Sequence, residues 1–206
     1  MIKKILDKIK ILNSLRDWRY IYSGKIKIKK AITTHPSPLK IILGSYRDTY
    51  DGWISTDLPY FNIFKESDWR FYFKKNSINN LLAEHVLEHL SEKNVEDVLA
   101  LAHKYLRSGG CFRIAVPDAY NPDPEYLDTV SPTGKIGSWY GHKSVHNYKT
   151  FSALAAKKKF EVKILEHFDE NGSYFLSTYT DKNGSIARSG KNANAEKSLI
   201  VDCLKK

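Results

Sequence analysis

The sequence predicts an α/β protein with a mostly parallel sheet, and three observations lead to this prediction. Short apolar segments recur along the chain and end at a glycine or an acidic residue, as buried parallel strands do. A helix with an apolar stripe separates two of these segments. An Asn-Gly turn in the last third of the chain is typical of an antiparallel hairpin. Strands and helices in this order indicate a sheet with helices on its faces and antiparallel strands at its edge.

Four apolar segments are predicted as the parallel strands. Gly44 ends the first, Asp57 closes the second, Glu84 and His85 follow the third, and Asp118 follows the fourth. Ligands of open α/β sheets bind beyond the carboxyl ends of the strands, so these residues are candidates for one site. A carboxylate there can accept two hydrogen bonds from a ribose diol. The segments are residues 39–43, 53–57, 78–83 and 111–117.

The remaining elements of the core follow from periodicity and turn signals. Ser91 is the predicted N-cap of a helix whose apolar residues recur at spacings of three and four over residues 95–106. Gly109 and Gly110 are predicted to end this helix. The other predicted elements are a helix at residues 148–159, an antiparallel hairpin of strands 160–168 and 173–180, and a last strand at residues 198–204.

The N-terminal region carries most of the positive charge. Residues 1–40 hold 11 Lys or Arg against 2 acids, which gives +9, whereas residues 41–206 hold 22 against 21, which gives +1. Residues 2–18 have helical spacing and residues 25–29 alternate as a strand would. Two prolines within residues 33–38 predict a boundary between a basic extension, residues 1–38, and a domain, residues 39–206.

The basic extension has three interpretations. We expect its apolar face to pack on the domain, with its lysine face in solvent. The second interpretation is contact of residues 1–40 with an anionic membrane surface, and a nucleic-acid arm is the least favoured. The first ten residues contain lysines where a signal peptide needs an unbroken apolar segment, and the chain has only two cysteines. These features favour the cytoplasm.

Two segments of the domain carry further candidate site residues. The aromatic stretch at residues 60–73 is interpreted as core that could also stack on a purine, with Asp68 as a partner for an adenine amino group. The segment at residues 119–147 is polar and long, and such loops usually serve binding or catalysis. The polar and aromatic side chains at its start and along it are Asp118, Tyr120, Asp123, Tyr126, Trp139, Tyr140, His142 and His146.

Several motifs together resemble a known family, the small class I, Rossmann-like S-adenosylmethionine-dependent methyltransferases, especially bacterial predicted methyltransferases. The resemblance covers the chain from about residue 39 to its end. The most specific part is HVLEHL at residues 85–90, followed by LRSGG at residues 106–110. The other parts are LGS at residues 43–45, GWI at residues 52–54 with Asp57, and FRIAVPD at residues 112–118.

The resemblance implies a fold, a cofactor and a set of cofactor-binding residues. The fold would be a Rossmann-like three-layer αβα sandwich with a seven-stranded, mostly parallel sheet and an antiparallel edge strand. The cofactor would be S-adenosyl-L-methionine. The Tyr- and His-rich segment at residues 119–147, and not the resemblance, suggests a small polar acceptor, for example a saccharide. The cofactor would be held by Gly44 and Ser45 in the first loop, by Asp57 and Leu58 at the ribose, and by Glu84 and His85 beside it.

Catalysis by methyl transfer consists mainly of alignment, with a base to take the proton of the acceptor. We predict that His142 or His146 is this base and that Asp118 orients the acceptor. Two alternatives stay open. Residues 46–49 stand where loops of the family usually hold further glycines, so the chain could be a catalytically inactive binding module. The other is a zinc-dependent hydrolase, with His85, His89, His142 and His146 as ligands.

Overall fold

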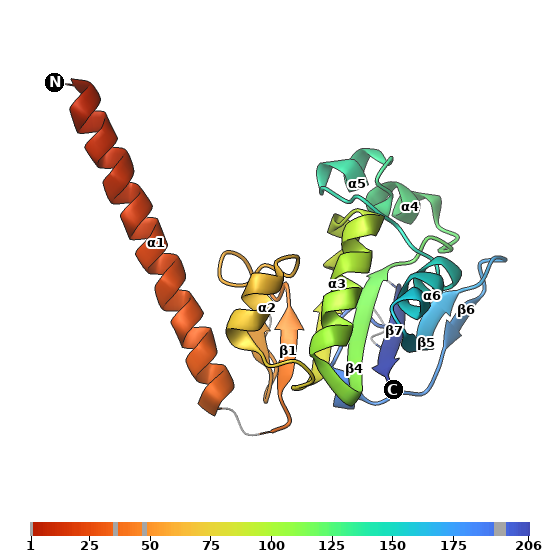
Figure 1. Ribbon diagram of the computed structural model, residues 1–206. Helices are drawn as coiled ribbons and strands as arrows, with labels where there is room; N and C mark the ends of the chain where they lie inside the picture. The colour runs from red at the N-terminus through yellow and green to blue at the C-terminus, as the bar shows by residue number, and fades with distance from the viewer. Residues whose placement is uncertain (1, 35–36, 47–48, 192–196) are drawn as a thin grey trace.

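The computed structural model describes residues 2–34, 37–46, 49–191 and 197–206, with side chains from residue 18 onward. Within these residues the chain forms one seven-stranded sheet in the order β2-β1-β3-β4-β7-β5-β6 (Figure 1). The strands are β1 (Lys40–Leu43), β2 (Ile54–Thr56), β3 (Ile78–Glu84), β4 (Leu106–Pro117), β5 (Phe160–Phe168), β6 (Tyr174–Leu176) and β7 (Ser198–Lys205).

Five of these strands, β1 to β5, run in the same direction. β1 pairs in parallel with β2 and β3, and β3 pairs in parallel with β4. β7 lies antiparallel between β4 and β5, and β6 closes the edge antiparallel to β5. The predicted Rossmann-like α/β class is therefore confirmed, with a mostly parallel sheet and an antiparallel edge. The strand predicted at residues 173–180 is shorter, because its register with β5 ends at Leu176.

Helices α2 (Glu66–Tyr72), α3 (Glu92–Tyr105) and α6 (Tyr148–Lys157) pack on one face of the sheet (Figure 1). Ser91 caps α3 as predicted, since its Oγ accepts from the backbone N–H of Asn94. The predicted end of this helix is wrong. Leu106 already has extended backbone and pairs with Ile78, so Gly109 and Gly110 lie inside β4.

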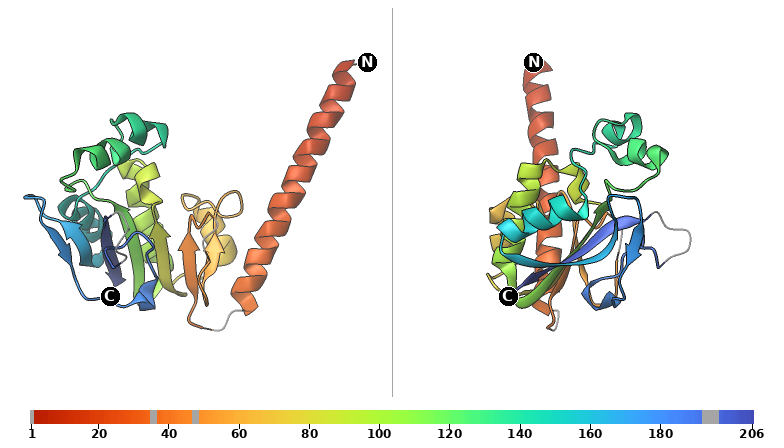
Figure 2. Two further views of the ribbon diagram at one scale, coloured as in Figure 1. Left: turned by 180° about the vertical axis from the view of Figure 1, so that it is seen from behind. Right: turned by 90° about the vertical axis from the view of Figure 1, so that its right-hand side faces the viewer.

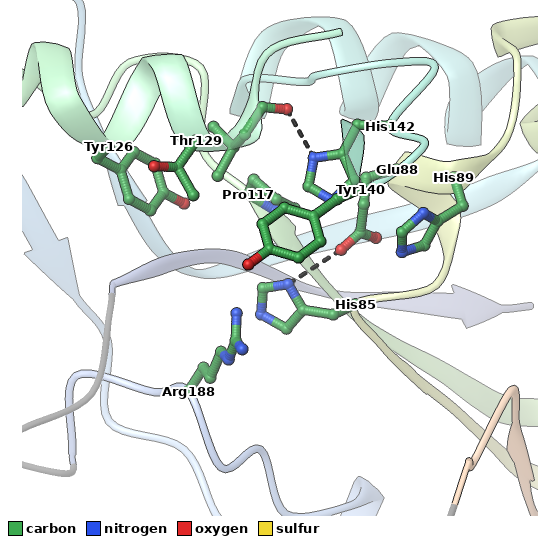
Figure 3. A pocket seen from close by; sticks show the side chains of 10 residues that line it. His85, Glu88, His89, Pro117, Tyr126, Thr129, Tyr140, His142 and Arg188 are labelled. Atoms are coloured by element: carbon green, nitrogen blue, oxygen red, sulfur yellow. Dashed lines mark hydrogen bonds and ion pairs between the residues drawn. The ribbon is translucent and has the colours of Figure 1, made fainter. Parts of the chain in front are cut away.

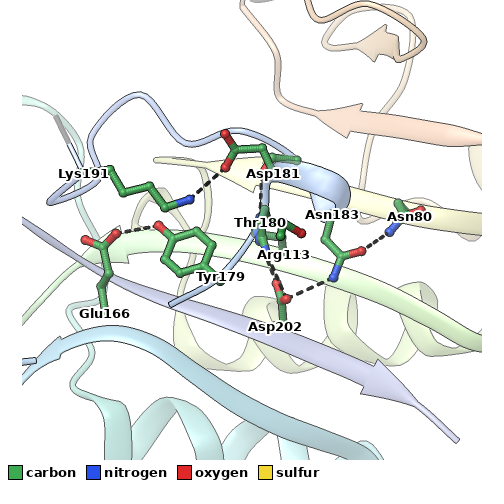
Figure 4. Close-up of polar contacts among 10 residues, drawn as sticks. Asn80, Arg113, Glu166, Tyr179, Thr180, Asp181, Asn183, Lys191 and Asp202 are labelled. Carbon is green, nitrogen blue, oxygen red and sulfur yellow. Dashed lines mark hydrogen bonds and ion pairs between the residues drawn. The ribbon is translucent and has the colours of Figure 1, made fainter. Parts of the chain in front are cut away.

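The opposite face of the sheet is covered by residues 177–191, an irregular segment that contains the short turn η2 (Asp181–Asn183). Arg113 of β4 points toward this segment and is almost fully buried. Its guanidinium makes two bonds to the Asp202 carboxylate, of 2.7 and 2.9 Å. It also donates to the carbonyls of Thr180 and Gly184, at 2.9 and 2.6 Å (Figure 4).

Besides Asp202 of β7, a buried acid on β5 holds the irregular segment at residues 177–191. Glu166 is fully buried and accepts hydrogen bonds from the hydroxyls of Tyr174 and Tyr179 and from the N–H of Gly190. Lys191 donates to Asp181 across this segment (Figure 4). Polar contacts to buried charges therefore fix the irregular segment to the sheet, where α/β folds commonly place helices.

The N-terminal helix α1 (Ile2–Thr34) is continuous for 33 residues, and its first half projects away from the sheet (Figures 1 and 2). The strand predicted at residues 25–29 is wrong. Ile28, Ala31 and Ile32 contact the core at helical spacings of three and four. Lys25 Nζ lies 2.7 Å from Asp68 Oδ1. The alternation of lysine and isoleucine is thus compatible with a helix, because only every third or fourth side chain faces the domain.

Gly24 allows close approach of α1 to the domain. A Cβ at this position would lie 2.1 Å from a ring carbon of Tyr60. None of the described helices is long and apolar enough to cross a membrane. Contact of residues 1–40 with an anionic membrane surface stays a prediction, as does the division at residue 38, and side chains 1–17 lie outside the described residues.

The segment predicted as a long loop contains two short helices, α4 (Pro124–Val130) and α5 (Lys135–Trp139). Asp123 starts α4 by accepting from the N–H groups of Glu125 and Tyr126. Both helices lie at the end of the sheet where β3 and β4 finish (Figure 2). The segment therefore forms a structured cover beside that edge.

Candidate active site

An apolar cavity of about 280 Å³ lies at the carboxyl ends of β1, β2 and β3. The chain passes from β1 to β2 on one side and returns to β3 on the other, so β1 and β3 flank the point where the strand order reverses. Ligands of open α/β sheets bind at this point. The cavity is lined by Gly44, Asp57, Leu58, Phe61, Asn62, Ile63, Phe64, His85, Val86, His89 and Leu90.

Gly44 and Asp57 occupy the predicted positions in this cavity. Gly44 has φ +63°, and a Cβ there would lie 2.8 Å from a methyl carbon of Val86. Asp57 Oδ2 accepts from the N–H of Tyr46, and Oδ1 accepts from the N–H of Leu58, both at 2.7 Å. Tyr46 is 80% exposed and does not line the cavity. Each Asp57 oxygen keeps a second lone pair, so the carboxylate is oriented and can still accept from a ligand.

The aromatic segment after β2 forms the apolar wall. Trp69 Nε1–H donates to the carbonyl of Ile63 at 2.9 Å, which fixes the chain between Phe61 and Phe64. The ring of Phe61 packs edge-on against Trp69, with centroids 5.2 Å apart. Phe61 is buried, whereas Phe64 is 40% exposed at the cavity. The predicted aromatic core thus also supplies a ring at the cavity wall.

A second, polar cavity of about 290 Å³ adjoins the first (Figure 3). His85 and His89 line both cavities, so these two side chains form the boundary between them. Helix α4 and the end of α5 contribute residues to the wall of this cavity. The polar cavity is lined by His85, Glu88, His89, Pro117, Tyr126, Thr129, Val130, Tyr140, His142 and Arg188.

The imidazoles of this cavity are held by specific bonds. His85 has φ +52°, and its Nδ1 lies 3.0 Å from Glu88 Oε1. His142 Nδ1–H donates to the carbonyl of Val130 at 2.8 Å (Figure 3). The rings of His89 and His142 meet edge to face, with centroids 4.8 Å apart. Because Nδ1 of His142 carries the donated proton, its Nε2 keeps a lone pair.

Two backbone bonds join the parts of this cluster that are distant in sequence. The N–H groups of Lys143 and Ser144 both donate to the carbonyl of Glu88, at 2.7 and 3.1 Å. Glu88 belongs to the 3-10 turn η1 (Leu87–His89), which follows β3. The motif at residues 85–90 and the segment around His142 are therefore fixed to each other.

Two of the three predicted catalytic residues are buried away from the described cavities. Asp118 is fully buried, and its carboxylate accepts from the N–H groups of Tyr120 and Phe168. Burial raises the pKa of Asp118, and these two hydrogen bonds oppose the rise. His146 is 3% exposed, bonds Ser144 Oγ, and has its pKa lowered by burial. Neither lines a described cavity, so of the predicted catalytic set only His142 faces the polar cavity.

Three predicted cofactor-binding residues lie outside the apolar cavity. Asp68 is buried and accepts hydrogen bonds from Lys25 and from the N–H of Asn62, so it links α1 to the domain. Glu84 accepts from the N–H of Arg188 at the end of β3. Ser45 lines a separate cavity of about 680 Å³ between α1 and the first loop, which Asp57 and Leu58 also line. Arg47 and Asp48 of that loop lie outside the described residues.

The four histidines of the zinc alternative do not meet. His146 bonds Ser144, and His85 is bonded on both nitrogens, to Glu88 and to Ser198 Oγ at 3.2 Å. The Ser198–His85–Glu88 arrangement has the distances of a hydrolase triad, but Ser198 is 1% exposed and lines no described cavity. A buried hydroxyl cannot reach a substrate, so the arrangement is structural.

The cavities also contain residues that the sequence analysis did not single out. Glu88 is central to the polar cavity, and its spacing of three from His85 within one turn was a usable signal. Arg188 comes from the irregular segment at residues 177–191, and Phe64 comes from the aromatic segment after β2. Nothing in the local sequence distinguishes either from its neighbours.

No family model matches this chain, and no curated protein matches it. Among solved structures, it is similar to a SAM-dependent methyltransferase, possible histamine N-methyltransferase, from Thermotoga maritima, with 13% identity and a TM-score of 0.47 over 95% of this chain and 96% of that one. It is also similar to a SAM-dependent methyltransferase from Archaeoglobus fulgidus, with 12% identity and a TM-score of 0.44 over 88% and 92%. A third is the CurJ carbon methyltransferase, with 12% identity and a TM-score of 0.49 over 87% of this chain and 52% of that one. Scores below 0.5 do not establish a fold, which here follows from strand order and direction.

Proposed function

We propose that this protein is an S-adenosylmethionine-dependent methyltransferase acting on a small polar acceptor. One observation carries the proposal: an apolar cavity with an oriented carboxylate lies at the reversal point of the sheet, and it shares a wall with a polar cavity. Methyl transfer needs a cofactor site and an acceptor site in contact. His85 and His89 lie at that junction.

The apolar cavity has groups that suit an adenosine moiety. Asp57 would accept from the ribose hydroxyls with the lone pairs left free by its two backbone bonds. The segment between Phe61 and Phe64 would contact the base, and Gly44 lets the backbone approach the methionine part. When bound, the cofactor would supply an electrophilic methyl group on sulfur.

The polar cavity determines what kind of acceptor fits. Its volume of about 290 Å³ lies just below the roughly 300–1,000 Å³ typical of ligand pockets, which favours a small acceptor. Carboxylate, imidazole, hydroxyl and guanidinium groups face it, as in sites for hydroxyl-rich ligands such as saccharides. His142 lines this cavity with its Nδ1 bonded to the Val130 carbonyl, and it is the residue that would act on the acceptor's proton through Nε2.

The proposal is tested by calorimetric titration with S-adenosylmethionine and S-adenosylhomocysteine. We expect micromolar binding to the native protein. Asp57→Ala should weaken binding by about 1–3 kcal/mol, because the ribose hydroxyls lose their acceptor. Thermal unfolding of the variant would show whether the loss of the two backbone bonds to Asp57 also loosens the fold.

Asp97→Ala is the matched control for this titration. Asp97 lies on the exposed surface of α3 in an ion pair with Lys93 and lines no described cavity, so binding should not change. No binding of either compound at millimolar concentration would contradict the proposed activity. It would favour the alternative of an inactive binding module, for which the lack of glycine at residues 46–49 is the supporting observation.

A further inference from the structure

Glu88, His89 and His142 each offer one metal-ligating atom, and these atoms lie within 4.8 Å of one another. The first two come from η1 and the third from the segment after α5, so the fold and not the sequence brings them together. We propose that these three residues bind a divalent transition-metal cation, with Zn²⁺ as the best match. The inference rests on the proposed function, because the cation would act on the acceptor of the same cavity.

Glu88 provides the strongest evidence for a ligand. Its side chain is 2% exposed, and Oε1 is bonded to His85 Nδ1. The other oxygen, Oε2, is buried and has no hydrogen-bond partner among the described residues. An unpaired buried carboxylate oxygen is costly, and native proteins satisfy nearly all such atoms. A cation beside Oε2 would satisfy this oxygen.

The surroundings of the three residues have the pattern of an outer shell around a metal. His142 donates Nδ1–H to the Val130 carbonyl, which fixes the ring and leaves Nε2 as the ligating nitrogen. His85 holds the ligating carboxylate in the same way. The bonds from Lys143 and Ser144 to the Glu88 carbonyl keep His142 next to η1 before any ion binds. Such outer-shell bonds orient ligands and select the tautomer.

The chemistry of the three ligands points to zinc. Two imidazoles and one carboxylate form the set of catalytic zinc sites, which leave the fourth position open. Ligand atoms around tetrahedral zinc lie roughly 3.3 Å apart, so the widest separation here must shorten by about 1.5 Å through side-chain rotation. Glu88, His89 and His142 line the same cavity as Tyr140 and Arg188, so a ligand in the open position would come from that cavity.

A cation there changes how the acceptor is activated. An acceptor oxygen in the open position would have its pKa lowered and release its proton to water. That oxygen would then form a bond to the methyl carbon while the carbon–sulfur bond breaks. The electron pair of the broken bond would stay on sulfur. His142 thus contributes as a ligand, and the cation supplies the polarisation that an imidazole base would otherwise supply.

The test is metal binding by the full chain after dialysis against a chelator. We expect ZnCl₂ titration to give one tight site and CoCl₂ to give the intense visible absorption of tetrahedral cobalt. His89→Ala and His142→Ala should weaken zinc binding by more than the roughly 10–100-fold typical of outer-shell substitutions, and His85→Phe should fall within that range. His167→Ala is the control, since His167 lies on β5 outside both cavities, and it should bind as the native protein does.

The outcomes separate this inference from the proposed function. Absence of stoichiometric zinc binding, or unchanged binding in His89→Ala, overturns the metal site. If binding of S-adenosylmethionine is intact at the same time, only the metal site is overturned. Zinc binding without binding of S-adenosylmethionine overturns the methyltransferase proposal and leaves the cation site in place.

Discussion

Arg113→Met is expected to lower the free energy of unfolding by about 3–5 kcal/mol, because it leaves the buried Asp202 carboxylate without its cation. The guanidinium also bonds the carbonyls of Thr180 and Gly184, so the irregular segment at residues 177–191 loses these two bonds to the sheet. Urea unfolding measures the energy. Limited proteolysis should show faster cleavage within residues 177–191.

Arg107→Met is the matched control, since Arg107 lies on the same strand but is exposed. It should change stability by no more than about 0.5 kcal/mol. The double variant Arg113→Met with Asp202→Leu should recover much of the lost free energy of unfolding, because two apolar side chains leave no buried charge unpaired. A loss below about 1 kcal/mol for Arg113→Met would mean that the ion pair does not hold the segment.

Trp69→Ala is the second large effect, with an expected loss of about 3–5 kcal/mol in the free energy of unfolding. Trp69 is fully buried, stacks on Tyr105 at 5.3 Å and meets Phe61 edge-on. Since it also bonds the Ile63 carbonyl, binding of S-adenosylmethionine should weaken in the same variant. Chemical unfolding and calorimetry measure the two effects.

Trp69→Phe separates packing from hydrogen bonding, because it keeps a ring and leaves the Ile63 carbonyl unpaired. Its expected loss is about 1–3 kcal/mol. Trp139→Ala serves as the control, since Trp139 is 79% exposed on α5 and its removal should leave stability nearly unchanged. If Trp69→Ala destabilised the fold but left cofactor affinity unchanged, the aromatic wall would not be part of the binding site.

Local patterns predicted most of the sheet correctly. The apolar segments before Gly44 and Asp57 are β1 and β2, and the segment at residues 160–168 is β5 with the same bounds. Buried strands are short and uniformly apolar, so their signal does not depend on distant residues. The errors lie where two structures share one pattern, as in the alternating residues 25–29, which are helical.

The surroundings of single polar side chains could not be predicted from the sequence, because they depend on residues distant in the chain. Asp118 and His146 have the chemistry of catalytic groups, and the structure places them in buried positions, bonded to nearby backbone or to Ser144. Asp68, a predicted partner of an adenine amino group, accepts a hydrogen bond from Lys25. Glu88 was part of the most specific motif, yet only its contacts with His85 and the segment after α5 reveal its position.

The sequence by itself determined the seven strands of the sheet, helices α3 and α6, and the placing of Gly44, Asp57 and His85 at the carboxyl edge, because periodicity and turn chemistry act over a few residues. Only the tertiary structure decided that His89 and His142 meet beside Glu88, and that an irregular segment covers the second face. These features come from contacts between residues some 50 to 110 positions apart, such as Arg113 with Asp202. No local pattern encodes such contacts, because they form only when the whole sheet is assembled.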